Sequence, residues 1–392
     1  MSTLRILHVG KYYPPAKGGI ETVVETLCRG ERATVDSRAL VINKSSDTVH
    51  EVVDDVPVTR VGSVATIGAV SVAPTLPWHL ARATADVMVL HEPNPMALVA
   101  YAIARPKIPL VVWFHSEVIR PLWRYRVFYQ PLLELALGRA ARIVVASPPM
   151  LEAPALARHR DKCTVVPFGL DPSRYKCTPA IATRVKAIRS RSRTPILLFV
   201  GRLVGYKGID VLLRALPGID ADTIIVGDGP QRLSLTALSY DLGLGERVRF
   251  VGEIPDEELQ AWYEACDALV LPSITRQEAF GMVQLEAMMR GHPVVCTDLG
   301  TGVSWVNQHE RTGLVVRPGD AQELRAALSR LIADSELRRQ FGKAARARVL
   351  DLFTAQQMCG GTVSLYREVT GLSEAAHSEV VVAAGNVVGA GR

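Results

Sequence analysis

Short apolar runs alternate with helical stretches along this chain, and the alternation occurs twice. Strands that alternate with helices in this way form βαβ units, whose strands lie side by side in a parallel sheet. The pattern therefore predicts two doubly wound α/β domains that face one another across a cleft, with ligands at the carboxyl ends of both sheets. The expected strands cover residues 5–9, 87–90, 109–114 and 143–146 in the first half, and 196–200, 223–226, 248–251, 268–271 and 293–296 in the second.

Length and composition fit two domains. The chain has 392 residues, of which 48% are hydrophobic and 21% charged, as is usual for globular proteins. A basic stretch interrupted by prolines separates the two halves and is typical of a linker. We expect a first domain over residues 1–175, a turn-rich linker over 176–194, a second domain over 195–352, a helix over 353–372 that returns to the first domain, and a disordered tail over 373–392.

Several classes of protein are excluded. A membrane-spanning helix needs about 20 apolar residues, and the longest apolar run, residues 108–114, is far shorter. The first residues lack the apolar segment and cleavage site of a signal peptide, so we expect a cytoplasmic protein. The six cysteines include no CxxC pair that would indicate a zinc site or a disulfide framework. The net charge of +6 fits a phosphate-bearing ligand or an anionic surface, and no basic and aromatic stripe indicates nucleic acid.

Two glycine-containing loops follow expected strands. Gly18 and Gly19 lie between the first strand and a helix, where the backbone can approach a ligand closely and the helix N-terminus favours phosphate. A plain glycine turn explains them equally well. In the second half, Arg202 and Lys207 belong to a loop that directly follows strand 196–200. These two cations suit a diphosphate leaving group whose charge must be neutralised, and solvated surface cations are the alternative.

The strongest local signal is the stretch 278–286, Glu-Ala-Phe-Gly-Met-Val-Gln-Leu-Glu, which follows strand 268–271 and opens a helix. Glu278 lies at the mouth of this helix and Glu286 about two turns inside it, so both can face one ligand. A donor sugar can meet the first carboxylate and a ribose the second. The residues whose N–H groups then face phosphates are Phe280, Gly281, Met282 and Val283.

These motifs resemble, in order, the landmarks of the retaining GT-B glycosyltransferases of glycosyltransferase family 4. The resemblance covers residues 4–370. It implies a GT-B fold of two Rossmann-like domains, the first on the acceptor side and the second binding a nucleotide sugar. The motifs that carry it are Gly18-Gly19-Ile-Glu, Gly201-Arg202 with Lys207-Gly208, Val226-Gly-Asp-Gly-Pro, Phe250-Val-Gly, the two glutamates of 278–286, and Gly313-Leu-Val-Val.

The resemblance also implies roles for single residues. His115, at the end of strand 109–114, matches the active-site histidine of the family, whereas by itself it would be interpreted as a locally hydrogen-bonded histidine. Catalytic roles are implied for His115, Glu278, Arg202 and Lys207. The implied contacts are Gly18 and Gly19 with the donor phosphate or the acceptor, Arg202 and Lys207 with the diphosphate, Ile254 with the base, Glu278 with the sugar hydroxyls and Glu286 with the ribose.

The acceptor side is less specific. His91, Glu92 and Asn94 follow strand 87–90 and resemble a loop that varies across the family, so they are candidate acceptor contacts that do not name the acceptor. Residues 275–277, Thr-Arg-Gln, precede Glu278 where many members carry small or acidic residues. This departure leaves the sugar open.

One apparent metal motif is set aside. Asp220 and Asp222 have the DxD spacing with which another glycosyltransferase fold holds a divalent metal, but they precede strand 223–226 and so lie at the wrong edge of the sheet. We therefore expect no catalytic metal and no cofactor besides the nucleotide-sugar substrate.

A basic and aromatic segment suggests contact with a membrane surface. Arg120, Arg124 and Arg126 alternate with apolar residues that include Trp123 and Phe128. Such a segment can lie on anionic lipid, which is consistent with a peripheral position on the cytosolic face of a membrane. An ordinary helix that packs its aromatic residues inward is the other interpretation.

Together these features predict a metal-independent retaining hexosyltransferase. We expect it to move mannose from GDP-mannose to a lipid-linked saccharide or glycolipid in the assembly of a cell-surface polysaccharide. The alternatives are a UDP-sugar-dependent glucosyl or N-acetylglucosaminyl transferase, a sugar-nucleotide epimerase, and a non-catalytic nucleotide-sugar-binding protein of the same fold. The base, the sugar, the linkage and the oligomeric state stay open.

Overall fold

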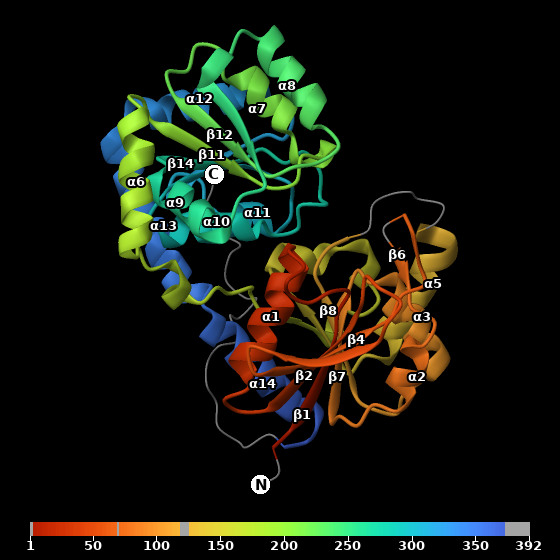
Figure 1. Cartoon of the computed structure of the whole chain (residues 1–392). Helices are drawn as coiled ribbons and strands as arrows, with labels where there is room; N and C mark the ends of the chain where they lie inside the picture. Colours follow the sequence, from red (N-terminus) through yellow and green to blue (C-terminus); the bar gives the residue numbers. More distant parts are fainter. Residues whose placement is uncertain (1–2, 69, 118–124, 373–392) are drawn as a thin grey trace. The chain divides into compact units, whose positions relative to one another are not determined.

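The computed structural model describes residues 3–68, 70–117 and 125–372 and divides the chain into two compact units (Figure 1). The first unit comprises Met1–Gly169 and Ala355–Arg392, and the second comprises Leu170–Thr354. Each unit is built on a mainly or wholly parallel sheet with helices on both faces. The predicted class of two doubly wound α/β domains is therefore confirmed.

The sheet of the first unit has eight strands among the described residues, in the order β10-β9-β8-β7-β1-β2-β4-β3. All neighbours are parallel except β3 and β4. From β1 the chain moves outward to β2 and β4, then returns to β7 on the other side, so the strand order reverses between β1 and β7. The strands are β1 Arg5–Val9, β2 Asp36–Ile42, β3 Val49–Val53, β4 Val56–Val61, β7 Val87–Glu92, β8 Leu110–Phe114, β9 Arg142–Val145 and β10 Cys163–Val165, with a separate hairpin of β5 Ala65–Ile67 and β6 Val70–Val72.

Helices cover both faces of this sheet. On one face, α1 packs its buried Val24 and Cys28 against Ala39 and Val41 of β2, and α14 lies alongside α1 (Figure 1). On the other face, α5 packs on β8 and contacts α3, which contacts α2. The helices are α1 Gly19–Glu31, α2 Leu76–Ala81, α3 Pro95–Ala104, α5 Gln130–Arg139 and α14 Ala355–Val369, and a π-helical turn spans Tyr125–Tyr129. The last helix of the described residues, α14, thus belongs to the first unit.

The sheet of the second unit has six parallel strands among the described residues, in the order β13-β12-β11-β14-β15-β16. Its strand order reverses between β11 and β14, which are direct neighbours. Such a reversal is the place where doubly wound sheets bind ligands. The strands are β11 Ile196–Val200, β12 Asp222–Val226, β13 Val248–Gly252, β14 Ala268–Leu271, β15 Val294–Thr297 and β16 Gly313–Val316.

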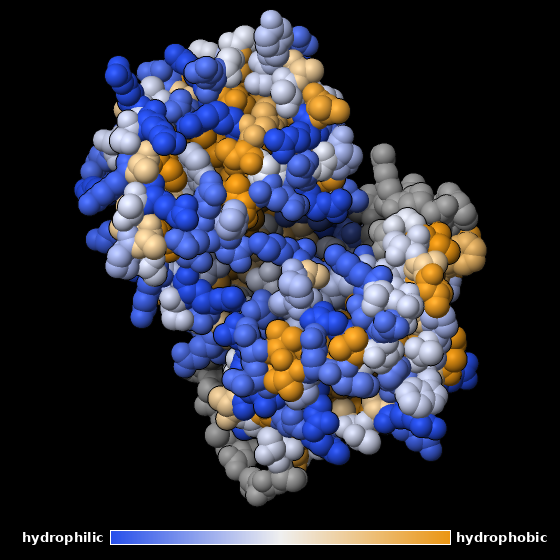
Figure 2. Space-filling view, in the orientation of Figure 1, coloured by the Kyte–Doolittle hydropathy of each residue, from blue (hydrophilic) through white to orange (hydrophobic). Residues whose placement is uncertain are grey.

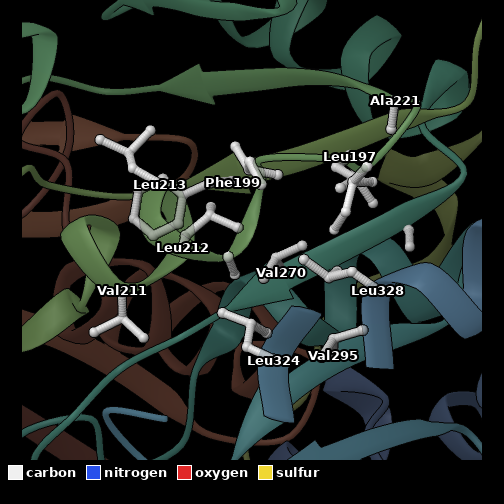
Figure 3. Close-up of a cluster of buried hydrophobic side chains, with 14 of the residues drawn as sticks. Leu197, Phe199, Val211, Leu212, Leu213, Ala221, Val270, Val295, Leu324 and Leu328 are labelled. Carbon is white, nitrogen blue, oxygen red and sulfur yellow. The ribbon is translucent and has the colours of Figure 1, made fainter. Parts of the chain in front are cut away.

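One continuous apolar core holds this second sheet to its helices. Leu197 and Phe199 of β11 and Val270 of β14 meet Leu212 of α7 and Leu328 of α12 (Figure 3). The other face is covered by α9 and α10, which contact β11 and β14. The helices are α6 Pro179–Arg191, α7 Ile209–Ala215, α8 Arg232–Asp241, α9 Asp256–Ala265, α10 Met282–Met289, α11 Gly302–Val306, α12 Ala321–Ala333 and α13 Ser335–Leu352.

The predicted linker over residues 176–194 is wrong for most of its length. Pro179–Arg191 forms helix α6, capped by the Thr178 hydroxyl, which accepts from the N–H of Ile181 at 3.3 Å. This helix packs on α9, and the whole stretch belongs to the second unit, which begins at Leu170. The sequence misled because α6 buries only Ile181, so its basic surface carries almost no apolar periodicity.

Two other predictions fall on parts of the chain that the structure does not describe. The predicted tail over 373–392 lies outside the described residues, and so do Arg120, Trp123 and Arg124 of the proposed lipid-contacting segment. No helix of the described residues is long and apolar enough to cross a membrane. The face shown in Figure 2 is mostly hydrophilic, with small separate hydrophobic patches on both units.

A close backbone contact fixes α10 against α13. A Cβ atom built on Gly342, inside α13, would lie 1.8 Å from the carbonyl oxygen of Gly291, just after α10. Only glycine permits this approach. The absence of a side chain at position 342 therefore lets α13 pack closely against the end of α10, the helix that carries Glu286.

We predict opposite effects for two glycine-to-alanine changes in helix interiors. Gly342→Ala should lower the free energy of unfolding by about 1–3 kcal/mol, since the methyl group overlaps the Gly291 carbonyl. Gly360→Ala in α14, which has open space around position 360, should raise it by about 0.5–1 kcal/mol because alanine is the better helix former. Denaturant unfolding of both variants checks this, and a stabilised Gly342→Ala would contradict the packing described.

Candidate active site

The reversal point of the second sheet brings two loops together. The loop over residues 201–208 leaves the carboxyl end of β11, and the loop over residues 272–281 leaves the carboxyl end of its neighbour β14. The backbone N–H of Ile274 in the second loop donates to the carbonyl of Tyr206 in the first at 2.8 Å. Residues far apart in the sequence thus form one continuous edge.

Lys207 and Glu278 form a buried ion pair at this edge. The Lys207 Nζ donates to Glu278 Oε2, and the Ser273 hydroxyl donates to the same oxygen at 2.9 Å. The two charged side chains are only 11% and 10% exposed. Burial opposes the charge of the Lys207 ammonium, but the adjacent Glu278 carboxylate raises the pKa of the lysine above its ordinary value. The lysine therefore stays charged beside the carboxylate.

Two glycines allow this approach of loops and helices. Gly208 has φ +64°, and a Cβ there would lie 2.1 Å from the carbonyl oxygen of Pro272. Gly281 has φ +75°, and a Cβ there would lie 2.6 Å from the Leu271 side chain. Any other residue at either position would push apart the loops that hold Lys207 and Glu278.

The N-terminus of α10 opens on the same edge. Gly281 is its N-cap residue, and Met282 and Val283 form the first turn with partly exposed backbone and side chains. Their N–H groups precede the first intrahelical hydrogen bonds, so they are placed to meet an anion. The Phe280 side chain points elsewhere, because it is 2% exposed and packs edge-on against Phe353 at 5.9 Å. Its side chain is structural, whereas its N–H group belongs to the edge.

The remaining predicted donor residues occupy the same unit. Arg202 is exposed directly after β11. Ile254 is partly exposed in the turn between β13 and α9. Glu286 is partly buried one turn into α10, where it accepts from the Tyr175 hydroxyl at 3.4 Å, and burial raises the pKa of its carboxyl group.

In the first unit, the predicted glycine loop leads into α1. Gly18 is the N-cap residue of α1, and a Cβ there would lie 2.2 Å from a carboxylate oxygen of Glu21. Gly19 is exposed, with open space where a side chain would stand. The loop therefore presents bare backbone at the carboxyl end of β1, as the sequence predicted.

His115 stands at the carboxyl end of β8 and is 3% exposed. Its Nε2 lies 2.9 Å from Nδ1 of His91, whereas its Nδ1 is buried without a hydrogen-bond partner among the described residues. Burial lowers the pKa of His115 to about 3, so the imidazole is neutral at physiological pH. A neutral, partly unsatisfied imidazole is a group with which a ligand can interact.

Comparison with known proteins places this arrangement in a family. The sequence model "Glycosyltransferase Family 4" matches residues 17–174, and the model "Glycosyl transferases group 1" matches residues 181–348. The chain is 34% identical to D-rhamnosyltransferase WbpZ of Pseudomonas aeruginosa over 90% of this chain and 93% of that protein. It is 31% identical to O-antigen chain mannosyltransferase C of Escherichia coli over 93% and 98% of the two chains. The chain is a family 4 glycosyltransferase.

Solved structures agree on the fold of the glycosyltransferase. Sucrose-phosphate synthase of Thermosynechococcus elongatus superposes with a TM-score of 0.78 at 24% identity, covering 94% of this chain and 99% of that one. WaaG, a glycosyltransferase involved in lipopolysaccharide biosynthesis, superposes with a TM-score of 0.71 at 20% identity, covering 93% and 100%. The predicted GT-B fold and hexosyltransferase activity are confirmed, and the relatives favour transfer over the epimerase alternative.

The candidate acceptor residues of the glycosyltransferase are all buried. Asn94 caps α3 by accepting from the N–H of Ala97 at 3.3 Å. Glu92 accepts from the Asn94 N–H at 2.7 Å and from the Tyr129 hydroxyl at 3.0 Å. His91 lies between two other histidines. These side chains therefore support the local structure, and their contact with an acceptor stays a prediction.

Asp220 and Asp222 lie at the amino end of β12, opposite the ligand edge. Asp222 is the first residue of the strand and accepts from the Ser192 hydroxyl. Arg247 and Arg249 lie 3.5 Å and 3.9 Å from the two carboxylates. Asp220, whose side chain is 75% exposed, fits the predicted surface turn, whereas Asp222 belongs to the strand and its side chain is only 21% exposed.

Sequence reasoning missed His8 and Glu31 of the glycosyltransferase. Both are completely buried, and His8 Nε2 lies 2.9 Å from Glu31 Oε2. His8 is the only polar side chain among the last four residues of β1, Ile-Leu-His-Val. A histidine inside an apolar strand was a signal that it must have a hydrogen-bonding partner.

We predict that Glu92→Gln makes stability less dependent on pH. Burial raises the pKa of Glu92 to about 8, so the folded state holds its proton from the ordinary value of 4.5 up to that pH. Folding of the wild type therefore weakens as pH rises through this window, because the unfolded state releases the proton first. The glutamine variant should match the wild type near pH 5 and exceed it at pH 9 by up to about 4 kcal/mol.

Thermal unfolding between pH 5 and 9 checks this prediction. Glu152→Gln is a matched control, because Glu152 is an exposed carboxylate in the same unit. A constant difference between wild type and Glu92→Gln across the range would contradict an uncharged Glu92.

Proposed function

We propose that this glycosyltransferase moves mannose from GDP-mannose to a lipid-linked saccharide, in the assembly of a cell-surface polysaccharide, with retention of the anomeric configuration. The observation that carries the donor site is the Lys207–Glu278 pair at the reversal point of the second sheet. A cation that can bind phosphate is here hydrogen-bonded directly to a carboxylate that can bind sugar hydroxyls.

The chemistry of the donor divides between these groups. The diphosphate gains charge as the bond to the sugar breaks, so Lys207, Arg202 and the N-terminus of α10 stabilise the transition state more than the bound substrate. Glu278 accepts hydrogen bonds from the sugar hydroxyls and holds the ring in place. Because Lys207 already holds Glu278, neither side chain needs to be reoriented when the donor arrives.

The relatives support mannose and a lipid-linked acceptor. WbpZ is named as a rhamnosyltransferase and the Escherichia coli relative as an O-antigen chain mannosyltransferase, each over nearly the whole chain. A relative from Mycobacterium tuberculosis, 32% identical over 46% of this chain, is named a GDP-mannose-dependent phosphatidylinositol monomannoside mannosyltransferase. Only the mycobacterial name gives a GDP-linked donor and a lipid-linked acceptor, whereas two of the three names give transfer of mannose.

The donor is tested by a panel of nucleotide sugars. At equal concentrations GDP-mannose should raise the melting temperature more than UDP-glucose, UDP-N-acetylglucosamine or ADP-glucose, because binding to the folded state stabilises it. Labelled mannose should then pass to lipid-linked saccharide in vesicles that contain anionic lipid. A larger shift with a UDP sugar would overturn the donor, and conversion of the donor sugar without transfer would indicate an epimerase.

Arg202 gives a kinetic test of transition-state stabilisation. Arg202→Ala should lower kcat about 100-fold with a smaller change in the KM for donor, because the guanidinium acts mainly on developing charge. Arg339→Ala is the control, since Arg339 is an exposed arginine of the same unit on α13. A raised KM with unchanged kcat would limit Arg202 to binding. Lys207→Ala is less informative because it also strips the buried Glu278 of its partner.

We also propose that transfer needs no metal ion. The cations Arg202 and Lys207 and the N-terminus of α10 supply the charge that a divalent metal supplies in other transferases. Exhaustive chelation should therefore leave the transfer rate unchanged. Loss of activity with chelator and its return with magnesium or manganese would refute this proposal.

A further inference from the structure

Three histidines, two on strands β1 and β7 and one directly after the neighbouring strand β8, form one hydrogen-bonded chain in the first unit. His8 of β1 lies with Nδ1 3.0 Å from Nε2 of His91 on β7, and Nδ1 of His91 lies 2.9 Å from Nε2 of His115. The ring centroids of these two pairs are 5.3 Å and 5.1 Å apart. Each centroid separation exceeds the corresponding N···N distance by about the diameter of one imidazole ring. The rings therefore meet edge to edge, which N–H···N hydrogen bonds require.

The inner end of the chain is the carboxyl group of Glu31. Its Oε2 faces His8 Nε2 at 2.9 Å and the Ser37 hydroxyl at 3.2 Å. Its Oε1 faces the hydroxyls of Thr362 at 2.8 Å and Tyr366 at 3.3 Å, both from α14. Four possible donors converge on one completely buried carboxyl group. Such a pattern stabilises the ionised form, which accepts hydrogen bonds at both oxygens.

An ionised Glu31 sets the direction of every hydrogen bond. A neutral His8 donates from Nε2, so its Nδ1 accepts, and a neutral His91 then donates from Nε2 to it. By the same step a neutral His115 donates from Nε2 to His91. The only ring nitrogen left over is Nδ1 of His115, which carries a lone pair and has no partner among the described residues.

Burial supports two of the neutral rings on which this reasoning depends, those of His91 and His115. It lowers the pKa of His91 well below the ordinary value, reinforced by the two neighbouring histidines, and it lowers the pKa of His115 to about 3. Trp113 lies 5.3 Å from His115, and Phe168 lies 5.3 Å from it as well, measured between ring centroids. These apolar rings exclude water from His115, which is the outer end of the line of histidines.

We propose that Glu31, His8 and His91 are positioning residues that hold His115 in the Nε2–H tautomer, so that its Nδ1 accepts a hydrogen bond from a sugar hydroxyl of the substrates. This inference rests on the proposed function, because it supplies the hydroxyl. The chain runs from α14 through α1 and three strands to the carboxyl edge of the sheet, at the place where the strand order reverses.

Nitrogen-15 NMR of the histidine side chains in the substrate-free, full-length enzyme tests the tautomers directly. At pH 7.5, His8, His91 and His115 should each show a protonated Nε2 and an unprotonated Nδ1. Assignment follows from the loss of single signals in His→Gln variants. A protonated Nδ1 on His115 would overturn the proposal, whatever the activity of the enzyme.

The Glu31→Gln variant tests whether Glu31 controls the tautomer of His115 through His8 and His91. Removing the charge should shift the His115 nitrogen signals away from the pure Nε2–H tautomer and lower kcat about 10-fold, with the KM for donor changed less than twofold. His159→Gln is the matched control, because His159 pairs with Glu134 at 3.0 Å in the same unit outside the chain. Unchanged His115 signals in Glu31→Gln would also overturn the proposal.

The two readouts separate this inference from the proposed function. If no donor is turned over but the tautomers are as described, the proposed function is wrong and the hydrogen-bonded arrangement of the histidines is confirmed. If mannose is transferred but His115 carries its proton on Nδ1, the function stands and the positioning role fails. Since the NMR measurement needs a folded protein only, a loss of activity by misfolding of a variant does not decide the question.

Discussion

The candidate donor site depends on one buried ion pair. Lys207 and Glu278 come from loops 71 residues apart, and they meet because β11 and β14 are neighbours in the sheet. Removing two charges from water is unfavourable unless each finds a partner, so the pair holds the two loops in one arrangement. Gly208 and Gly281 allow the backbone to come close enough for that contact. A polar ligand then meets charges that are already oriented.

Different side chains lie at the point where the strand order of the first unit reverses. From β1 across β7 runs a line of buried imidazoles that leads from Glu31 to His115. Helix α14, which follows the second unit in sequence, supplies Thr362 and Tyr366 to the inner end of this line. The return of the chain to the first unit thus has a chemical consequence as well as a packing one.

Much of the fold follows from the sequence because buried parallel strands are continuous apolar runs. Arg5–Val9, Ile196–Val200 and Ala268–Leu271 have the predicted bounds, since water-excluded strands tolerate few polar residues. The edge strand β3 and its neighbour β4 were missed, as were β2 and β10. Partly buried polar residues and a proline interrupt the buried valines of β4, and β3 is exposed along most of its length, so neither shows such a run.

The sequence predicts which residues belong to the candidate site, but it does not predict their hydrogen-bonding partners. The motif around Glu278 indicates a ligand site, yet the sequence does not show that its carboxylate binds Lys207, because that contact depends on the strand order. Glu92 illustrates the converse, since a carboxylate after a strand suggests a ligand contact but here accepts from Asn94 and Tyr129. The partners that the fold supplies to each carboxylate, which one sequence does not reveal, distinguish these roles.

Amide hydrogen exchange with and without GDP-mannose tests the central claim most directly, because it reports where the donor binds without requiring turnover. Exchange should slow in peptides that cover residues 201–208 and 278–286, including the amides of Met282 and Val283 at the start of α10. Peptides from the amino end of β12, around Asp220, should be unchanged. Protection around Asp220, with none at 201–208 and 278–286, would contradict a donor site built on Lys207 and Glu278.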